Sequence, residues 1–318
     1  MVRRILALFE PFILALLGTV VLATLLPARG SFAPVASAAA TVGIVALFFL
    51  HGARLSREAI WDGMRNWRLH AAVLATTFAL FPLLGLGLAH LFTGPVAAGL
   101  LFLTLLPSTV QSSIAFTAIA RGNVAAAVCS ASFSNLIGIV LTPALVALLM
   151  GNAGAGISLA SIEAIVFQLL VPFVAGHLLR PWIGAWVARQ KKMLTLVDRG
   201  SILLVVYTAF GAAVVEGLWH HVSPGDLALI LAACIALLAT VLAATWGIGR
   251  AMGLSREDAI VLLFCGSKKS LASGVPMAGV LFPAAQVGVV LLPVMLFHQI
   301  QLIACALIAK RMSVDKVG

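Results

Sequence analysis

The chain consists of long hydrophobic stretches separated by short polar gaps. Each stretch approaches the roughly 20 residues that a helix needs to cross the hydrocarbon core of a bilayer. Because backbone N–H and C=O groups inside a bilayer must be paired within the chain, such stretches are expected to be helical. The pattern predicts an all-α integral membrane protein with ten transmembrane helices, over residues 11–28, 34–53, 69–92, 95–120, 124–150, 159–179, 198–218, 225–249, 257–282 and 284–309.

Composition excludes an ordinary water-soluble domain. Hydrophobic residues make up 62% of the 318 residues and charged residues 9%, whereas soluble domains are about 25% charged. The net charge of +10 does not indicate a nucleic-acid partner, because the basic residues fall in the gaps and form no aromatic-interleaved patch. The four cysteines lie inside apolar stretches and form no Cys-x-x-Cys pair. We therefore expect them to pack as small hydrophobic residues and to form neither disulfides nor metal sites. They are Cys129, Cys234, Cys265 and Cys305.

The basic residues also orient the chain. With the N-terminus in the cytoplasm, Arg29 is the one Lys or Arg in a gap that falls on the outer side, and cytoplasmic gaps are expected to hold the excess of positive charge. We therefore expect both termini in the cytoplasm and the lipid bilayer of an inner (plasma) membrane as the environment. The opening residues also resemble a signal peptide cleaved near Ala28, but the charge distribution favours a first transmembrane helix.

The gap near residues 151–158 divides the predicted helices into five and five. Because five is odd, a second half like the first would lie inverted in the membrane, as in inverted-repeat transporters. We predict a first repeat over residues 1–152 and a second over 153–318.

Two predicted helices are interrupted by polar residues. The fourth carries Pro107–Ser113 and the ninth carries Cys265–Ser270, at matching places in the two halves. A single kink in a membrane helix usually reflects packing. Paired interruptions dense in polar side chains instead indicate a substrate site lined by unwound backbone, so we expect a polar cavity there.

Four short stretches carry a resemblance to a known family: Asn66–His70, Leu106–Ser113, Arg121–Asn123 and Phe264–Leu271. They resemble the bile acid:sodium symporter family, specifically its SBF-like branch. The resemblance implies two inverted repeats of five helices, with a panel made by spans 1, 2, 6 and 7 and a core made by spans 3–5 and 8–10. It also implies that helices 4 and 9 cross beside the ion and substrate sites.

The sequence departs from sodium-coupled relatives where those proteins hold sodium. By the resemblance, Phe264 stands where they have a Glu, and Thr77 where they have a Gln on the third helix. Lys268 and Lys269 replace a Gln and an Asn of the crossover. Two ammonium groups beside a cation site would repel sodium, which binds hard oxygen ligands and benefits from nearby negative charge.

Some features of a sodium site remain. Ser112 and Ser113 keep hydroxyl oxygens, whereas Ala127 and Ala131 replace hydroxyl residues of the fifth helix. All ten Asp and Glu residues lie in gaps or near the ends of predicted helices. Sodium coupling through the family's usual ligands is therefore not expected, and a sodium ion near Ser112 and Ser113 is kept as an alternative.

The two lysines allow three interpretations. They can snorkel to an interface or pair with backbone carbonyls. Lys268 can act as a tethered cation in place of sodium, with gain and loss of its proton driving transport. Lys269 can neutralise an anionic group of the substrate, helped by the half-helix N-termini near Ser108 and Ser270. The last two interpretations are compatible.

His298 and Gln299 match a His-Asn pair that lines the cavity in relatives, although a lone His on an apolar helix is often simply hydrogen-bonded. Asn135 can face the same cavity or join helices to one another. The candidate substrate and ion site comprises Lys268, Lys269, Ser267, Ser270, Ser108, Thr109, Gln111, Ser112, Ser113, Thr77, His298 and Gln299.

These features predict a secondary transporter that carries a small organic anion by alternating access, coupled to protons or to no ion. A sodium-coupled symporter of bile-acid type is the alternative. An enzyme is not expected, because the sequence lacks His-Glu-x-x-His, Gly-x-Ser-x-Gly and a mid-span acid pair. A regulator without transport activity is a remote alternative. No cofactor is expected beyond H⁺ or Na⁺ as coupling ions, and the identity of the substrate and the oligomeric state stay open.

Overall fold

A computed structural model describes residues 11–54, 66–150, 163, 166–217 and 223–314, and the secondary structure in these ranges is entirely helical. Seven helices there are long and apolar enough to cross a membrane: Phe32–Arg54, Trp67–Ala89, Val124–Met150, Val166–Arg189, Lys192–Val215, Gly225–Ala251 and Ala284–Ser313. The all-α integral membrane class is confirmed. Ten crossings, inverted repeats and the halves 1–152 and 153–318 stay predictions.

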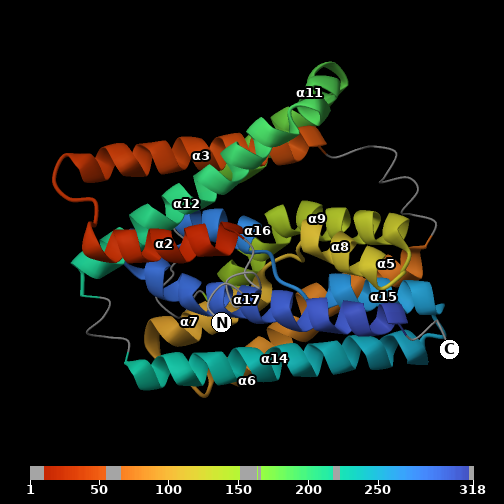
Figure 1. The fold of residues 1–318 in the computed structure, drawn as a ribbon. Coiled ribbons are helices and arrows are strands. Elements are labelled where there is room, and N and C mark those ends of the chain that lie inside the picture. The colour runs from red at the N-terminus through yellow and green to blue at the C-terminus, as the bar shows by residue number, and fades with distance from the viewer. Residues whose placement is uncertain (1–10, 55–65, 151–162, 164–165, 218–222, 315–318) are drawn as a thin grey trace. The chain divides into compact units, whose positions relative to one another are not determined.

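The chain forms two compact units, each assembled from separate segments. The first unit takes residues 1–55, 154–223 and 275–291. It contains the described helices α2 (Pro11–Leu25), α3 (Phe32–Arg54), η2 (Val166–Leu170), α11 (Val171–Arg189) and α12 (Lys191–Val215). Helix α3 packs against both α11 and α12, and α12 also packs against α2 (Figure 1).

Helices α3 and α11 approach each other very closely. A Cβ added at Gly52 would lie 1.9 Å from the carbonyl oxygen of Phe173, and one added at Gly176 would lie 1.9 Å from that of Phe49. Small residues at such crossings let two backbones approach in a membrane, where van der Waals packing drives helix association. The crossing therefore requires both glycines.

Helix α12 begins earlier than predicted. It starts at Lys191, whereas the hydrophobic stretch begins at Asp198, so charged residues expected in a gap lie on its first turns. The Asp198 carboxylate accepts a hydrogen bond of 2.6 Å from Arg54 on α3. The ion pair joins α12 to α3 where the predicted stretch begins, and hydropathy alone does not predict the helical turns before it. The gap residues Arg57 and Arg65 lie outside the described ranges.

The second unit takes residues 56–153, 224–274 and 292–318. Its helices are α5 (Trp67–Ala75), η1 (Thr76–Leu80), α6 (Phe81–Ala89), α7 (Gly94–Leu105), α8 (Gln111–Ile119), α9 (Val124–Met150), α14 (Pro224–Ala251) and α15 (Arg256–Gly266). Helices α16 (Leu271–Leu281) and α17 (Ala284–Val314) contribute residues to both units.

Both predicted interruptions are present. The stretch 95–120 forms α7 and α8, separated by Leu106–Val110, and the stretch 257–282 forms α15 and α16, separated by Ser267–Ser270. Leu106 is extended, with φ −73° and ψ 153°, because the residue before a proline avoids the helical region. Pro107 thereby ends α7.

A π-helical turn, which the sequence analysis did not predict, lies between α5 and α6. At η1 the N–H of Phe81 donates to the carbonyl of Thr76, five residues back. Pro82 follows directly and has no N–H. Wide turns of this kind are rare and often occur at functional sites.

Candidate functional site

The structure brings the two interruptions together in the second unit. The backbone N–H of Ser270 donates to the carbonyl oxygen of Pro107 at 2.8 Å. Ser108 Oγ donates to the carbonyl of Cys265 at 2.6 Å, and Ser113 Oγ donates to that of Phe264 at 3.0 Å. The last carbonyls of a helix have no partner within it, so these hydroxyls cap the end of α15 from the other interruption.

Helix α9 joins both interruptions. Asn135 Nδ2 donates to the carbonyl of Ser108 at 2.7 Å, and its Oδ1 accepts from Ser273 Oγ at 2.9 Å. Ser134 Oγ accepts from the backbone N–H of Ser108 at 2.9 Å. Of the two interpretations left open for Asn135, the geometry matches the one in which it joins helices.

Lys269 is fully buried and its ammonium group is fully hydrogen-bonded. Its Nζ donates to the carbonyl oxygens of Thr77, Thr104 and Leu106 at 2.8, 2.7 and 2.7 Å. The same nitrogen lies 4.1 Å from the centre of the Phe81 ring, within range of a cation–π interaction. No hydrogen of Lys269 is left for a substrate in this conformation, and the contacts match the interpretation in which a lysine pairs with backbone carbonyls.

Two of these carbonyls lack their usual helical partners. In an α-helix the carbonyl of Thr77 would accept a hydrogen bond from the N–H of Phe81, but that N–H donates to Thr76 instead. A π-helical bond to Thr77 would have to come from Pro82, which has no N–H. The carbonyl of Thr104 would accept from Ser108, whose N–H goes to a side chain of α9. The π turn and the end of α7 thus each expose an acceptor.

The backbone of Lys269 is held by Gln301 on α17, a residue that the sequence analysis missed. Gln301 Oε1 accepts from the N–H of Lys269 at 2.9 Å, and its Nε2 donates to the carbonyl of Lys269 at 2.8 Å. His298 Nδ1 lies 2.9 Å from the same amide nitrogen. The buried Gln301 therefore satisfies both backbone polar groups of Lys269, and its amide nitrogen also contacts His298.

Lys268 has a different environment. It is also fully buried, but within the described residues its ammonium finds one acceptor, Ser112 Oγ at 3.2 Å. The nitrogen lies 4.3 Å from the centre of the Phe116 ring and 5.8 Å from that of Phe264. An ammonium group carries three donor hydrogens, so Lys268 keeps donor capacity that Lys269 has used.

The hydroxyl groups around Lys268 form a short chain. Ser112 Oγ donates to Thr109 Oγ1 at 3.0 Å, and Thr109 Oγ1 lies 3.1 Å from Ser113 Oγ. The position beside Ser112 and Ser113 that was kept as an alternative sodium site therefore lies next to an ammonium group. The arrangement offers cationic and hydroxyl donors rather than a carboxylate.

The remaining candidates serve local structure or lie apart from the cluster. Ser267 Oγ donates to the carbonyl of Leu263 in the preceding helix α15, and Thr77 Oγ1 donates to the carbonyl of Val73 at 2.8 Å. Ser270 Oγ accepts from the N–H of Ser273 at 3.1 Å, at the start of α16.

Two candidates make no side-chain hydrogen bond in the cluster. Gln111 is exposed and has no hydrogen bond to the described residues. The Oε1 atom of Gln299 is buried without a hydrogen-bond partner in the described ranges. The structure thus brings together most of the predicted residues, and these two glutamines stay outside its hydrogen-bond network.

Two of the stretches that resemble the family, Asn66–His70 and Arg121–Asn123, meet at the start of α15. The Asp258 carboxylate, in the first turn of α15, accepts from Asn66 Nδ2 and from Asn123 Nδ2, each at 2.9 Å. A carboxylate near a helix N-terminus is also favoured by the helix dipole. These asparagines therefore fix the starts of α5 and α9 to the start of α15.

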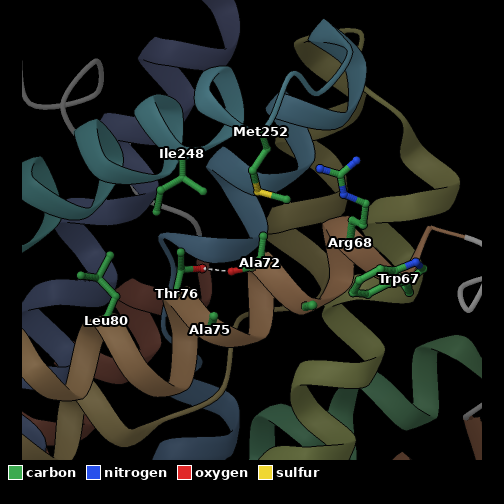
Figure 2. Close-up of a pocket in the computed structure, with 9 residues that line it drawn as sticks. Trp67, Arg68, Ala72, Ala75, Thr76, Leu80, Ile248 and Met252 are labelled. Carbon is green, nitrogen blue, oxygen red and sulfur yellow. Dashed lines mark hydrogen bonds between the residues drawn. The ribbon is translucent and has the colours of Figure 1, made fainter.

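A cleft of about 480 Å³ lies beside this core, between α5, η1 and α14 (Figure 2). Trp67 and Arg68 line one end, Ile248 comes from α14, and Met252 follows its last residue. Thr76 lines it too, but its Oγ1 is bonded to the carbonyl of Ala72 at 3.0 Å. The cleft is mostly apolar, and the polar groups of the interruptions are buried against one another instead of lining it.

Long apolar helices with two polar interruptions place the chain in the class of multi-pass membrane proteins. Residues 10–314 match the SBF-like CPA transporter family. The chain therefore belongs to this family of transporters, which is not a family of enzymes, and its resemblance to the bile acid:sodium symporter family is confirmed.

Individual relatives agree. An uncharacterized protein of Pseudomonas aeruginosa is 57% identical over 307 residues, covering 95% of this chain and 92% of that protein. YfeH of Escherichia coli, provisionally named a symporter, is 51% identical over 312 residues, covering 97% of this chain and 94% of YfeH. Sodium/bile acid cotransporter 7 of Rattus norvegicus is 25% identical over 270 residues, covering 82% of this chain and 79% of the cotransporter.

Proposed function

We propose that the protein is a secondary transporter that carries a small organic anion across the plasma membrane by alternating access. Lys268 acts in it as a built-in cation that takes the place of a coupling ion. The single observation that carries the proposal is the buried Lys268 ammonium, which has one hydrogen-bond acceptor among the described residues, close to where the two interruptions meet.

The charge balance around the interruptions favours an anion. No Asp or Glu occurs in residues 63–162 or 259–314, which contain both interruptions. Charged groups inside a membrane are costly and are usually retained for function. An anionic group on a substrate would supply the negative charge that these two stretches lack and would accept the unused hydrogens of Lys268.

We assign different roles to Lys268 and Lys269. The three carbonyls around Lys269 occupy its hydrogens, so the proposal places the contact with the substrate, or the gain and loss of a proton, on Lys268. The hydroxyls of Ser112, Thr109 and Ser113 are neighbours that can reorient as the charge changes.

Alternating access needs two bodies that move against each other. We take these to be a panel of spans 1, 2, 6 and 7 and a core of spans 3–5 and 8–10, in a ten-helix arrangement of two inverted repeats with both termini in the cytoplasm. The broken helices belong to the core, so the anion would travel with it.

The alternative is a sodium-coupled symporter that uses oxygen atoms of Ser112, Ser113 and nearby carbonyls. The name of the sodium/bile acid cotransporter of Rattus norvegicus supports this alternative. The ammonium 3.2 Å from Ser112 Oγ argues against it, because like charges at that distance repel strongly inside a membrane.

The test uses purified protein and its Lys268→Met variant, which keeps a side chain of similar length without the charge. Taurocholate, benzoate, succinate and glycerol phosphate are each added, and the unfolding temperature is measured with and without sodium. We expect at least one anion to stabilise the wild-type protein, without a need for sodium, and not to stabilise Lys268→Met.

The stabilising anion is then followed as uptake into proteoliposomes. We expect uptake that responds to a pH gradient, survives replacement of sodium by choline and is lost in Lys268→Met. Strict dependence on sodium would support the alternative, and a lack of response to all four anions would contradict the proposal.

A further inference from the structure

We infer that the backbone carbonyls of Thr77, Thr104 and Leu106 form a binding site for a primary ammonium ion, which Lys269 occupies as a tethered ligand. When the lysine side chain is removed, a small alkylammonium ion in solution binds in its place. The inference concerns the fold of the second unit and does not depend on what the protein transports.

The number of hydrogens identifies the occupant. A carbonyl oxygen can only accept a hydrogen bond, so three carbonyls around one nitrogen require three N–H groups. A primary ammonium has these three, whereas a neutral amine or a water molecule can donate only two. The distances of 2.7 to 2.8 Å from Lys269 Nζ lie in the range of charge-assisted hydrogen bonds.

An aromatic ring completes the site. The centre of the Phe81 ring lies 4.1 Å from Lys269 Nζ, and the ring face attracts a cation through its quadrupole. Carbonyl dipoles and a ring face provide negative potential without a carboxylate. The site therefore selects a cation that has several N–H donors.

The acceptors are available for reasons that do not involve Lys269. The carbonyl of Thr77 is left free by the π turn and by Pro82, and that of Thr104 is left free because the N–H of Ser108 is bonded to α9. Leu106 lies in the interruption, outside the helical hydrogen-bond pattern. The site should therefore persist when the ammonium is absent.

The test uses Lys269→Ala, which removes the three outer carbon atoms and the nitrogen of the side chain, the same heavy atoms as n-propylammonium. The variant is made by cell-free synthesis into lipid nanodiscs, with or without n-propylammonium chloride. Because n-propylammonium is not attached to the chain, its binding costs translational and rotational entropy that the lysine side chain does not lose. We therefore expect millimolar concentrations to be needed.

Two measurements are made. We expect several-fold more monodisperse Lys269→Ala protein when the amine is present during synthesis. For protein that folds, we expect the unfolding temperature to rise by about 5 °C at amine concentrations roughly 100-fold above the dissociation constant.

Three controls separate the site from general effects. Sodium chloride at equal concentration controls for ionic strength, and propyltrimethylammonium has the same charge without N–H groups. Lys269→Met fills most of the space without a donor, so it should remain unstable and should not respond to n-propylammonium.

Equal recovery of Lys269→Ala with and without the amine, including aggregation in both cases, would overturn the inference. So would equal stabilisation by sodium or propyltrimethylammonium, because either result would remove the role of the three N–H donors. Wild-type stability in Lys269→Met would show that Lys269 only fills space.

Discussion

Gln301→Leu is a sharp test of how the second interruption is held. The side chain of Gln301 pairs with both the N–H and the carbonyl of Lys269. Leucine has a similar volume but no polar atoms, so the substitution leaves two buried backbone groups without these partners and creates little empty space.

The expected cost follows from these two bonds. Side-chain hydrogen bonds inside a membrane contribute about 0.6 kcal/mol each on average, which sets a lower limit near 1 kcal/mol. Leaving a buried polar group unsatisfied costs about 1–3 kcal/mol. Because the N–H and carbonyl of Lys269 lie in a short interruption between α15 and α16, few other partners are near them. We therefore expect a loss of roughly 2–4 kcal/mol.

The native cysteines provide the assay. All four are free and buried: Cys129, Cys234, Cys265 and Cys305. A thiol-reactive fluorescent dye therefore reports unfolding as each thiol becomes exposed. At about 2–4 °C per kcal/mol, Gln301→Leu should lower the unfolding temperature by on the order of 5–10 °C.

Gln299→Leu is the matched control on the same helix. The buried Oε1 of Gln299 has no hydrogen-bond partner in the described ranges, so the same substitution removes an unsatisfied acceptor and should leave stability unchanged or slightly higher. The reasoning is refuted if Gln301→Leu unfolds within 1 °C of the wild-type protein or if Gln299→Leu is the more damaging change.

Two further predictions use the same thiol assay. Gly52→Ala places a methyl group 1.9 Å from a backbone oxygen of Phe173, so we expect a loss of about 2 kcal/mol or more, whereas Gly18→Ala, with nothing within 4 Å, should be neutral. Thr142→Val removes the 2.7 Å hydrogen bond from Thr142 to a carbonyl at the end of α7 and should cost about 1 kcal/mol. Thr19→Val removes an exposed hydrogen bond within its own helix and should cost little. If Gly18→Ala proved more damaging than Gly52→Ala, or Thr19→Val more damaging than Thr142→Val, burial and close packing would not explain these losses.

The sequence predicts the ends of a helix well where the whole helix is hydrophobic. Runs such as 124–150 match a described helix closely, because in a bilayer an apolar run has no alternative to helical hydrogen bonding. The first interruption was predictable for a local reason as well, since Pro107 lacks the N–H that a helix interior uses. Helix α12 begins at Lys191, before its predicted stretch, because lysine favours helices although it lowers the hydropathy.

The sequence indicated which polar side chains gather at the interruptions, but it did not indicate their backbone partners. The density of polar residues near Lys268 indicated the place, but the partners of Lys269 are carbonyl oxygens, which every residue carries and no sequence pattern marks. Gln301 was missed in favour of Gln299. Two residues apart on a helix lie on different faces, and the face that meets the interruption is set by packing.

The direct contact between the two interruptions has a consequence for sequence variation. The hydrogen bond from Ser270 to Pro107 runs from one main-chain atom to another, so it does not depend on which side chains those positions carry. This one contact therefore survives a change of the side chains at the two positions, and a main-chain link between the interruptions remains. Among the encoded amino acids, proline at position 270 is the one that would remove the donor.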